Sequence, residues 1–153
     1  MEKIQQKIDS KIGPLYLVAS EKYLNGIFWK RQAGIPIGRS AVISRATKQI
    51  GEYLSGVRKR FDIPLRVDGT PFQKSVWKEL SRIPYGKTVS YKDVARRIRR
   101  TKAVRAVGNA NGKNPICIVV PCHRVIANDG SLGGYSGRSG VKGRLLALEK
   151  ANR

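Results

Sequence analysis

The first sixty residues alternate short apolar runs with turn residues, and a longer stretch of helical periodicity follows. Three apolar runs predict β-strands, at residues 4–8, 15–19 and 26–30. Gly13-Pro14 predicts a turn between the first two strands. From Ser40 to Ser55 the apolar residues recur every three or four positions, which predicts a helix that ends just before Gly56. This part of the chain therefore predicts a small sheet and one helix.

The second part of the chain carries sharper signals for helix starts. A capping box at residues 70–73 predicts a helix that ends by about residue 83. Ser90 is expected to cap the next helix, and Thr101 a third helix that runs to about Asn111. Two helices joined by a tight turn are typical of a helix-turn-helix, although a simple helical hairpin fits the same pattern.

A Pro-containing stretch at residues 63–71 separates the two patterns and is interpreted as a linker. The predicted domains are therefore residues 1–62, a supporting α/β domain, and residues 72–153, which contain the helix-turn-helix. The fold class is α/β in the broad sense, and α+β in detail, because the strands and the helices occupy different parts of the chain.

Composition adds a partner to this picture. The chain has 153 residues and a formal net charge of +21, and 41% of its residues are hydrophobic. This hydrophobic content suffices for a folded core, and the charge indicates a polyanionic partner and argues against an ordinary neutral metabolic enzyme. No signal peptide and no transmembrane run is apparent, so we expect a soluble cytoplasmic protein without membrane contact.

The charge is concentrated in the second part, where residues 63–153 hold +14 of it. Its densest run, residues 96–105, contains six cations and favours phosphate contact over a merely solvated helix face. In the predicted third helix, Lys102 and Arg105 are the only long side chains. Small residues allow the backbone to approach closely, which suits the minor groove of DNA and binding at any sequence.

One cysteine stands out as a candidate nucleophile. Cys122 follows an apolar run that predicts a β-strand, and it precedes His123 and Arg124, which could lower the pKa of the thiol and hold it as thiolate. Cys117 lies inside the run and is interpreted as a core residue. Two cysteines and one histidine are too few for a metal site, and their spacing in a strand argues against a disulfide. Since neighbours in a strand point to opposite faces, proton transfer from Cys122 to His123 would need a bridging water or a loop geometry.

These motifs resemble the O6-alkylguanine-DNA alkyltransferases. The resemblance rests on the Pro-Cys-His-Arg-Val segment at 121–125, together with Asn-Pro at 114–115, Val-Ser-Tyr at 89–91, Arg-Ala-Val-Gly at 105–108 and Gly-Tyr-Ser-Gly at 134–137. It covers residues 70–151 and implies a ribonuclease H-like N-terminal domain followed by a winged-helix-like DNA-binding and active-site domain.

The resemblance also implies a role for each matching residue in catalysis. Cys122 would attack the alkyl carbon on guanine O6, and Glu149 would orient His123, which would deprotonate Cys122 through a water. Tyr91 would assist flipping of the nucleotide and donate its hydroxyl to guanine N3. Arg105 would fill the gap that the flipped nucleotide leaves.

Further residues are implied in binding. The DNA contacts would also come from Arg100, Lys102 and Ala106. The substrate pocket would be built by Asn111, Asn114, Val125, Tyr135 and Ser136, with the carbonyls of Cys122 and Val125 holding the exocyclic amine and the Ser136 amide donating to O6. Asn111 stands where several relatives carry a larger apolar residue.

The implied activity is a single-turnover transfer without cofactor or metal. The partner would be double-stranded DNA containing O6-alkylguanine and, more weakly, O4-alkylthymine, and the protein would act as a nucleoid-associated monomer. Three alternatives remain at this point: a non-catalytic alkyltransferase-like protein, a helix-turn-helix regulator, and a cysteine hydrolase that turns over repeatedly.

Overall fold

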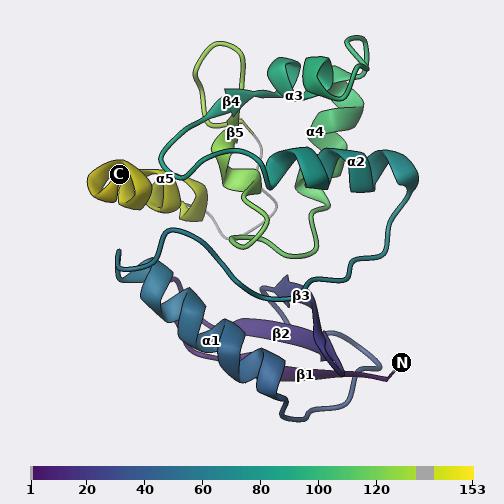
Figure 1. Cartoon of the computed structure of the whole chain (residues 1–153), viewed down its shortest axis with the longest axis vertical. Helices are drawn as coiled ribbons and strands as arrows, with labels where there is room; N and C mark the ends of the chain where they lie inside the picture. The colour runs from purple at the N-terminus through teal and green to yellow at the C-terminus, as the bar shows by residue number, and fades with distance from the viewer. Residues whose placement is uncertain (1, 134–139) are drawn as a thin grey trace. The chain divides into compact units, whose positions relative to one another are not determined.

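The computed structural model describes residues 2–133 and 140–153, and its chain divides into two compact units between Val67 and Asp68 (Figure 1). This division falls within the 63–71 stretch. We refer to the two parts as the N-terminal unit and the C-terminal unit.

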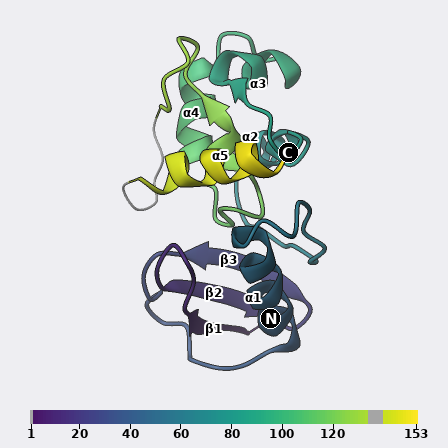
Figure 2. The same ribbon diagram turned by 90° about the vertical axis from the view of Figure 1, so that its left-hand side faces the viewer.

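The N-terminal unit is an antiparallel sheet with one helix packed against it (Figure 2). The sheet has the order β1-β2-β3, formed by Lys3–Ile8, Leu15–Ser20 and Tyr23–Phe28. Helix α1, Ala41–Leu54, contacts β2 and β3, and its buried stripe includes Ile43, Ile50 and Tyr53. The sheet contributes Leu15 and Leu17, both fully buried. The apolar periodicity therefore builds the core of this unit.

The predicted ends of α1 are confirmed. The side chain of Ser40 accepts a hydrogen bond from the Ile43 amide, and Gly56 adopts a left-handed φ of 81° just past the helix. The third strand differs from its prediction, because it begins at Tyr23 and not at residue 26. A tight connection between β2 and β3 and a register shift between Val18 and Ala19 start the pairing earlier than the apolar run indicates.

The C-terminal unit is mainly helical. Its elements are α2 Pro71–Leu80, β4 Val89–Ser90, α3 Tyr91–Arg97, α4 Val104–Gly112, the 3₁₀ turn Cys122–Arg124, β5 Val125–Ile126 and α5 Val141–Asn152. Helix α2 contacts α3 and α4, and these two contact each other. The short strands β4 and β5 pair in parallel, so Tyr91, which follows β4, starts α3 beside the segment that follows the 3₁₀ turn. Capping boxes at Thr70 and at Ser90 confirm the predicted helix starts.

The start of the third predicted helix was wrong. Helix α4 begins at Val104 without a side-chain cap, because a turn closed by a hydrogen bond from the Ala103 amide to the Arg100 carbonyl precedes it. Thr101 therefore caps no helix, and Lys102 lies in the turn and not on α4. The turn also contains Arg99 with a left-handed φ of 60°.

The apolar run before Cys122 is not a strand either. It forms a compact loop in which Ile118 has a φ of 74° and the Val119 amide donates to the Cys117 carbonyl at 2.9 Å. A γ-turn of this kind is strained for a β-branched residue, so the local sequence alone favours the extended form. The burial of Ile116 and Ile118 compensates for this strain, because both side chains are buried in the core of the unit.

Candidate active site

Cys122 opens the 3₁₀ turn and has an exposed fraction of 3%. The loop before it is held by Asn114, whose side-chain nitrogen donates to the Val120 carbonyl at 2.7 Å and whose oxygen accepts from the Ile116 amide at 3.1 Å. This double contact fixes the bend that delivers Cys122 to its place. Because Cys122 and His123 lie on a tight turn, the expectation that they point to opposite faces of a strand was wrong.

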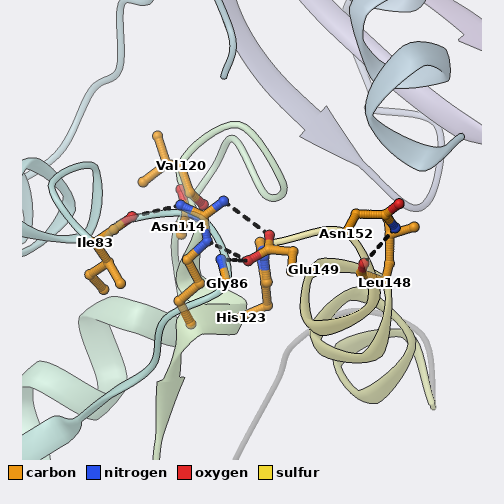
Figure 3. A network of polar contacts seen from close by, with 9 residues as sticks. Ile83, Gly86, Asn114, Val120, His123, Leu148, Glu149 and Asn152 are labelled. Atoms are coloured by element: carbon orange, nitrogen blue, oxygen red, sulfur yellow. Dashed lines mark hydrogen bonds and ion pairs between the residues drawn. The ribbon is translucent and has the colours of Figure 1, made fainter. Parts of the chain in front are cut away.

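His123 belongs to a buried polar network around Glu149 on α5 (Figure 3). His123 Nε2 and Glu149 Oε2 are 2.7 Å apart. The guanidinium of Arg124 donates to both carboxylate oxygens of Glu149, at 2.8 and 3.0 Å. The Gly86 amide adds a fourth contact at 3.0 Å. Such a bidentate pair with further donors fixes the carboxylate, and therefore the imidazole, in one orientation.

Burial lowers the pKa of His123, and the hydrogen bond and charge of Glu149 oppose this shift. The Arg124 guanidinium already balances the Glu149 carboxylate, and it also donates to the Ile83 carbonyl at 2.6 Å. A second cation in this place would be unbalanced, so burial prevails and the imidazole is neutral at pH 7. A neutral imidazole can accept a proton, as a general base must.

The expectation that Arg124 holds Cys122 as thiolate was wrong. Burial raises the pKa of the Cys122 thiol, while a hydrogen bond from Asn114 and the charge of Lys142 lower it only in part. Arg124 does not act on the thiol because its guanidinium is committed to Glu149. The resting group is therefore a thiol, and its reaction requires a base.

Lys142 is a functional candidate that the sequence analysis missed. It lies on α5, is 3% exposed, and donates to the Val125 carbonyl at 2.6 Å. Its ammonium is also 3.5 Å from the Tyr91 hydroxyl. Burial lowers the pKa of Lys142 and the nearby Cys122 raises it. Since Glu149 and Arg124 compensate each other, Lys142 is left to balance a negative charge on the Cys122 sulfur.

The signal for Lys142 in the sequence is weak. Val141 and Leu145 have helical spacing and are both buried, but helix α5 was not predicted. A lysine between apolar positions ordinarily extends its ammonium into solvent, so only the three-dimensional arrangement reveals that this one is enclosed.

Tyr91 lies at the start of α3 and is enclosed on several sides. A side-chain carbon added at Gly133 would come within 2.9 Å of its ring, and one at Gly108 of α4 within 3.9 Å. The Lys142 ammonium is 5.7 Å from the centre of the ring. The structure thus brings together Tyr91, Lys142 and the Val125 carbonyl, next to the segment that carries Cys122.

Comparison of the chain with known protein families identifies the family in which this arrangement of residues occurs. The profile described as 6-O-methylguanine DNA methyltransferase, DNA binding domain, matches residues 71–151, and the profile of the ribonuclease-like domain of the same protein matches residues 4–67. The chain belongs to the 6-O-methylguanine DNA methyltransferase family. The resemblance and the fold class predicted from the sequence are thereby confirmed.

Two relatives illustrate the match to this family. The methylated-DNA–protein-cysteine methyltransferase of Methanosarcina barkeri is 45% identical over 151 residues, covering 95% of this chain and 96% of its own. The crystal structure of the Mycobacterium tuberculosis O6-methylguanine methyltransferase has a TM-score of 0.91 and 41% identity, with 99% of this chain and 94% of that chain covered. A structure of the Mycobacterium tuberculosis protein in complex with DNA matches with the same TM-score and 42% identity.

Within the methyltransferase fold, the predicted DNA contacts and pocket residues occupy different places. Arg105 and Ala106 are exposed on α4, and Arg100 and Lys102 are exposed in the turn before it. Asn111, by contrast, is buried and donates to the Cys122 carbonyl at 3.3 Å. Tyr135 and Ser136 lie outside the described residues.

Two further features of this family member concern metals and membranes. In residues 2–133 and 140–153, no group of three His, Cys, Asp or Glu side chains is arranged to hold a metal ion. Over the same residues, no helix is both long and apolar enough to span a bilayer.

Proposed function

We propose that this protein repairs O6-alkylguanine in double-stranded DNA by transferring the alkyl group to its own Cys122. This activity is that of a methylated-DNA–protein-cysteine methyltransferase, the name that relatives at 44–49% identity carry. The observation that carries the proposal is the buried Cys122 thiol beside the Glu149, His123 and Arg124 network, within the DNA-binding domain of this family.

The reaction begins with removal of the thiol proton. His123, neutral and oriented by Glu149, takes the Cys122 proton through a water, and Lys142 offsets the negative charge on sulfur. The thiolate then attacks the alkyl carbon in line, so the sulfur–carbon bond forms while the bond between that carbon and guanine O6 breaks.

The leaving guanine needs a proton as it departs. The Tyr91 hydroxyl donates this proton to guanine N3, so that the base leaves neutral and not as an anion. The Lys142 ammonium, 3.5 Å from the same hydroxyl, returns a proton to Tyr91. Each proton has a donor and an acceptor in this scheme.

DNA is bound through α4 and the turn before it. The small residues of α4, Ala106 among them, allow close approach to the minor groove, and Arg105 fills the space that the flipped nucleotide leaves. Arg100 and Lys102 bind backbone phosphates. The N-terminal domain, residues 1–62, supports the domain at 72–153 and contributes no reacting group.

The pocket over Cys122 includes Asn111, Asn114 and Val125 together with Tyr135 and Ser136. It accepts O6-alkylguanine and, more weakly, O4-alkylthymine. The product thioether is stable and the chemistry needs no cofactor, so each molecule reacts once. We place this reaction in the cytoplasm, on nucleoid DNA, and assign it to the monomer.

Intact mass spectrometry tests the proposal. After incubation with a duplex containing O6-methylguanine, the protein is expected to gain the mass of one methyl group. Cys122→Ala should gain nothing, whereas Cys117→Ala, which removes a buried thiol in the preceding loop, should react like the wild type. Binding without an adduct would identify a non-catalytic reader of lesions, and repeated turnover would identify a hydrolase; either result contradicts the proposal.

A further inference from the structure

In the part of the chain that the structure describes, only one of the two polar atoms of the Asn111 side-chain amide forms a hydrogen bond. It lies in the last turn of α4 with an exposed fraction of 2%, and its nitrogen donates to the Cys122 carbonyl at 3.3 Å. Its oxygen is also buried, but among the described residues no donor reaches it. A buried acceptor without a hydrogen bond lowers the stability of the fold and is rare in proteins. We therefore expect a ligand to donate a hydrogen bond to this oxygen.

The orientation of this amide follows from its neighbour. A backbone carbonyl can only accept hydrogen bonds, so the Cys122 carbonyl must face the nitrogen of Asn111. Exchanging the two ends of the amide would bring two oxygens together. The nitrogen of the amide therefore faces the Cys122 carbonyl, and the side-chain oxygen points away from it.

The carbonyls that the family resemblance assigns to the exocyclic amine of guanine already have donors. The Cys122 carbonyl accepts from the Val125 amide as well as from Asn111, which uses both of its lone pairs. The Val125 carbonyl accepts from the Lys142 ammonium at 2.6 Å. Among the described residues, the Asn111 oxygen is by contrast a buried acceptor that receives no hydrogen bond at all.

The chemistry of the base identifies the donor that fits. O6-alkylguanine has lost the hydrogen at N1, so its 2-amino group is the one hydrogen-bond donor on the base. O4-alkylthymine has no donor at all. We infer that the side-chain oxygen of Asn111 accepts a hydrogen bond from the 2-amino group of the flipped base, which makes Asn111 a specificity-determining residue for 2-aminopurines. This inference rests on the proposed alkyl transfer.

The burial of the oxygen is compatible with this role. Cys122 is itself only 3% exposed, so the proposed alkyl transfer already requires the base to reach a buried atom. Because the Asn111 nitrogen is hydrogen-bonded to the Cys122 carbonyl, a base that reaches the sulfur lies next to this amide. Binding of the base then supplies the donor that the free protein lacks.

Two substrates that differ only in the 2-amino group measure its contribution to the reaction rate. One duplex contains O6-methylguanine, and the other contains O6-methylhypoxanthine, which differs only in lacking that group. Single-turnover rates are measured for the wild type and for Asn111→Leu, which removes the acceptor at similar volume. The wild type should react about tenfold faster with the guanine, as expected for one buried hydrogen bond. In Asn111→Leu the two rates should become equal, with the hypoxanthine rate close to that of the wild type.

Control variants separate specificity from folding. Asn109→Leu, exposed on the same helix, should keep the wild-type ratio of rates, and Asn111→Met gives a second, unbranched replacement if the leucine variant does not fold. Equal wild-type rates on both duplexes would overturn the inference, as would a variant that slows both reactions by the same factor. If the wild type transferred no methyl group from either duplex, the proposed function itself would fail.

Discussion

The two units differ in the kind of polar group that they bury. In the described part of the N-terminal unit, the buried polar side chains are the uncharged Gln5, Ser20 and Gln49. The C-terminal unit buries Glu149, Arg124 and Lys142 around Cys122 and His123, and it also buries Glu79 of α2, which pairs with Arg82. Burying a charge is expensive, and well-packed apolar residues often give equal or greater stability. The contrast indicates that the charges buried around Cys122 serve the thiol, while the buried amides of the N-terminal unit serve its fold.

The largest expected effect comes from removing the charge at the centre of the network. Glu149→Gln leaves the Arg124 guanidinium buried without its counter-ion, so the free energy of unfolding should fall by about 3 kcal/mol. His123 also loses its anionic partner, and the rate of methyl transfer by the folded protein should fall about 100-fold. Urea denaturation and single-turnover kinetics measure the two effects.

A matched carboxylate in the N-terminal unit provides the control. Glu52 forms an ion pair with Arg58 at 3.0 Å, and both side chains are about one third exposed. Glu52→Gln should lower the free energy of unfolding by less than about 1 kcal/mol and leave methyl transfer unchanged. Equal losses in the two variants would remove the distinction between the units.

An intermediate effect is expected from the buried amide of Gln5. Its nitrogen donates to the carbonyls of Gln32 and Ile35 at 2.7 and 2.6 Å, and its oxygen accepts from the Gln32 amide at 2.9 Å. Gln5→Leu leaves these partly buried backbone groups unpaired, so the free energy of unfolding should fall by about 2 kcal/mol. Gln49→Leu, which breaks two such bonds, should cost less.

The Gln5→Leu and Gln49→Leu variants also test whether the N-terminal unit takes part in methyl transfer. Below their unfolding temperatures, both should transfer methyl groups within about twofold of the wild-type rate, because each unit has its own core. A large loss of rate in folded Gln5→Leu protein would show that the N-terminal unit takes part in the reaction.

The smallest effect concerns a charge at the surface of the C-terminal unit. Arg99 is exposed and has a left-handed φ of 60°, a conformation that glycine adopts without strain. Arg99→Gly should therefore raise the free energy of unfolding by up to about 1 kcal/mol. It should also flatten the salt dependence of DNA binding if Arg99 contacts a phosphate.

Arg97→Gly is the matched comparison, because it removes the same charge from the last residue of α3. Within a helix glycine is unfavourable, so this variant should be less stable than the wild type. A loss of stability in both variants would contradict the strain assigned to Arg99. Thermal unfolding and DNA binding at several salt concentrations separate the two contributions.

Local signals in the sequence were sufficient for the elements that begin with a strong cap. The capping box at Thr70 and the cap residue Ser90 predicted two helix starts, because in both caps the side chain and the backbone satisfy each other within four residues. Where the decisive contact is distant, the prediction failed. The loop before Cys122 is held by Asn114 and by the core burial of Ile118, and neither contact is visible in a local apolar pattern.

The site was predictable to a similar degree. Cys122 and His123 follow from a specific motif, and the Glu149 contact with His123 that the resemblance implied is present at 2.7 Å. Arg124 was assigned to the thiol, but it binds Glu149 across 25 positions of the chain. Lys142 was missed because its role depends on enclosure by Tyr91 and the Val125 carbonyl, which no spacing in the sequence encodes.

The most direct test of the account counts methyl groups per protein molecule. The protein is mixed with a large molar excess of duplex containing O6-methylguanine, and the methylated peptide is located after proteolysis. The account predicts a plateau at one methyl group per molecule, carried by the peptide that contains Cys122. A plateau above one, continued demethylation of the duplex without a protein adduct, or a methyl group on Cys117 would contradict it.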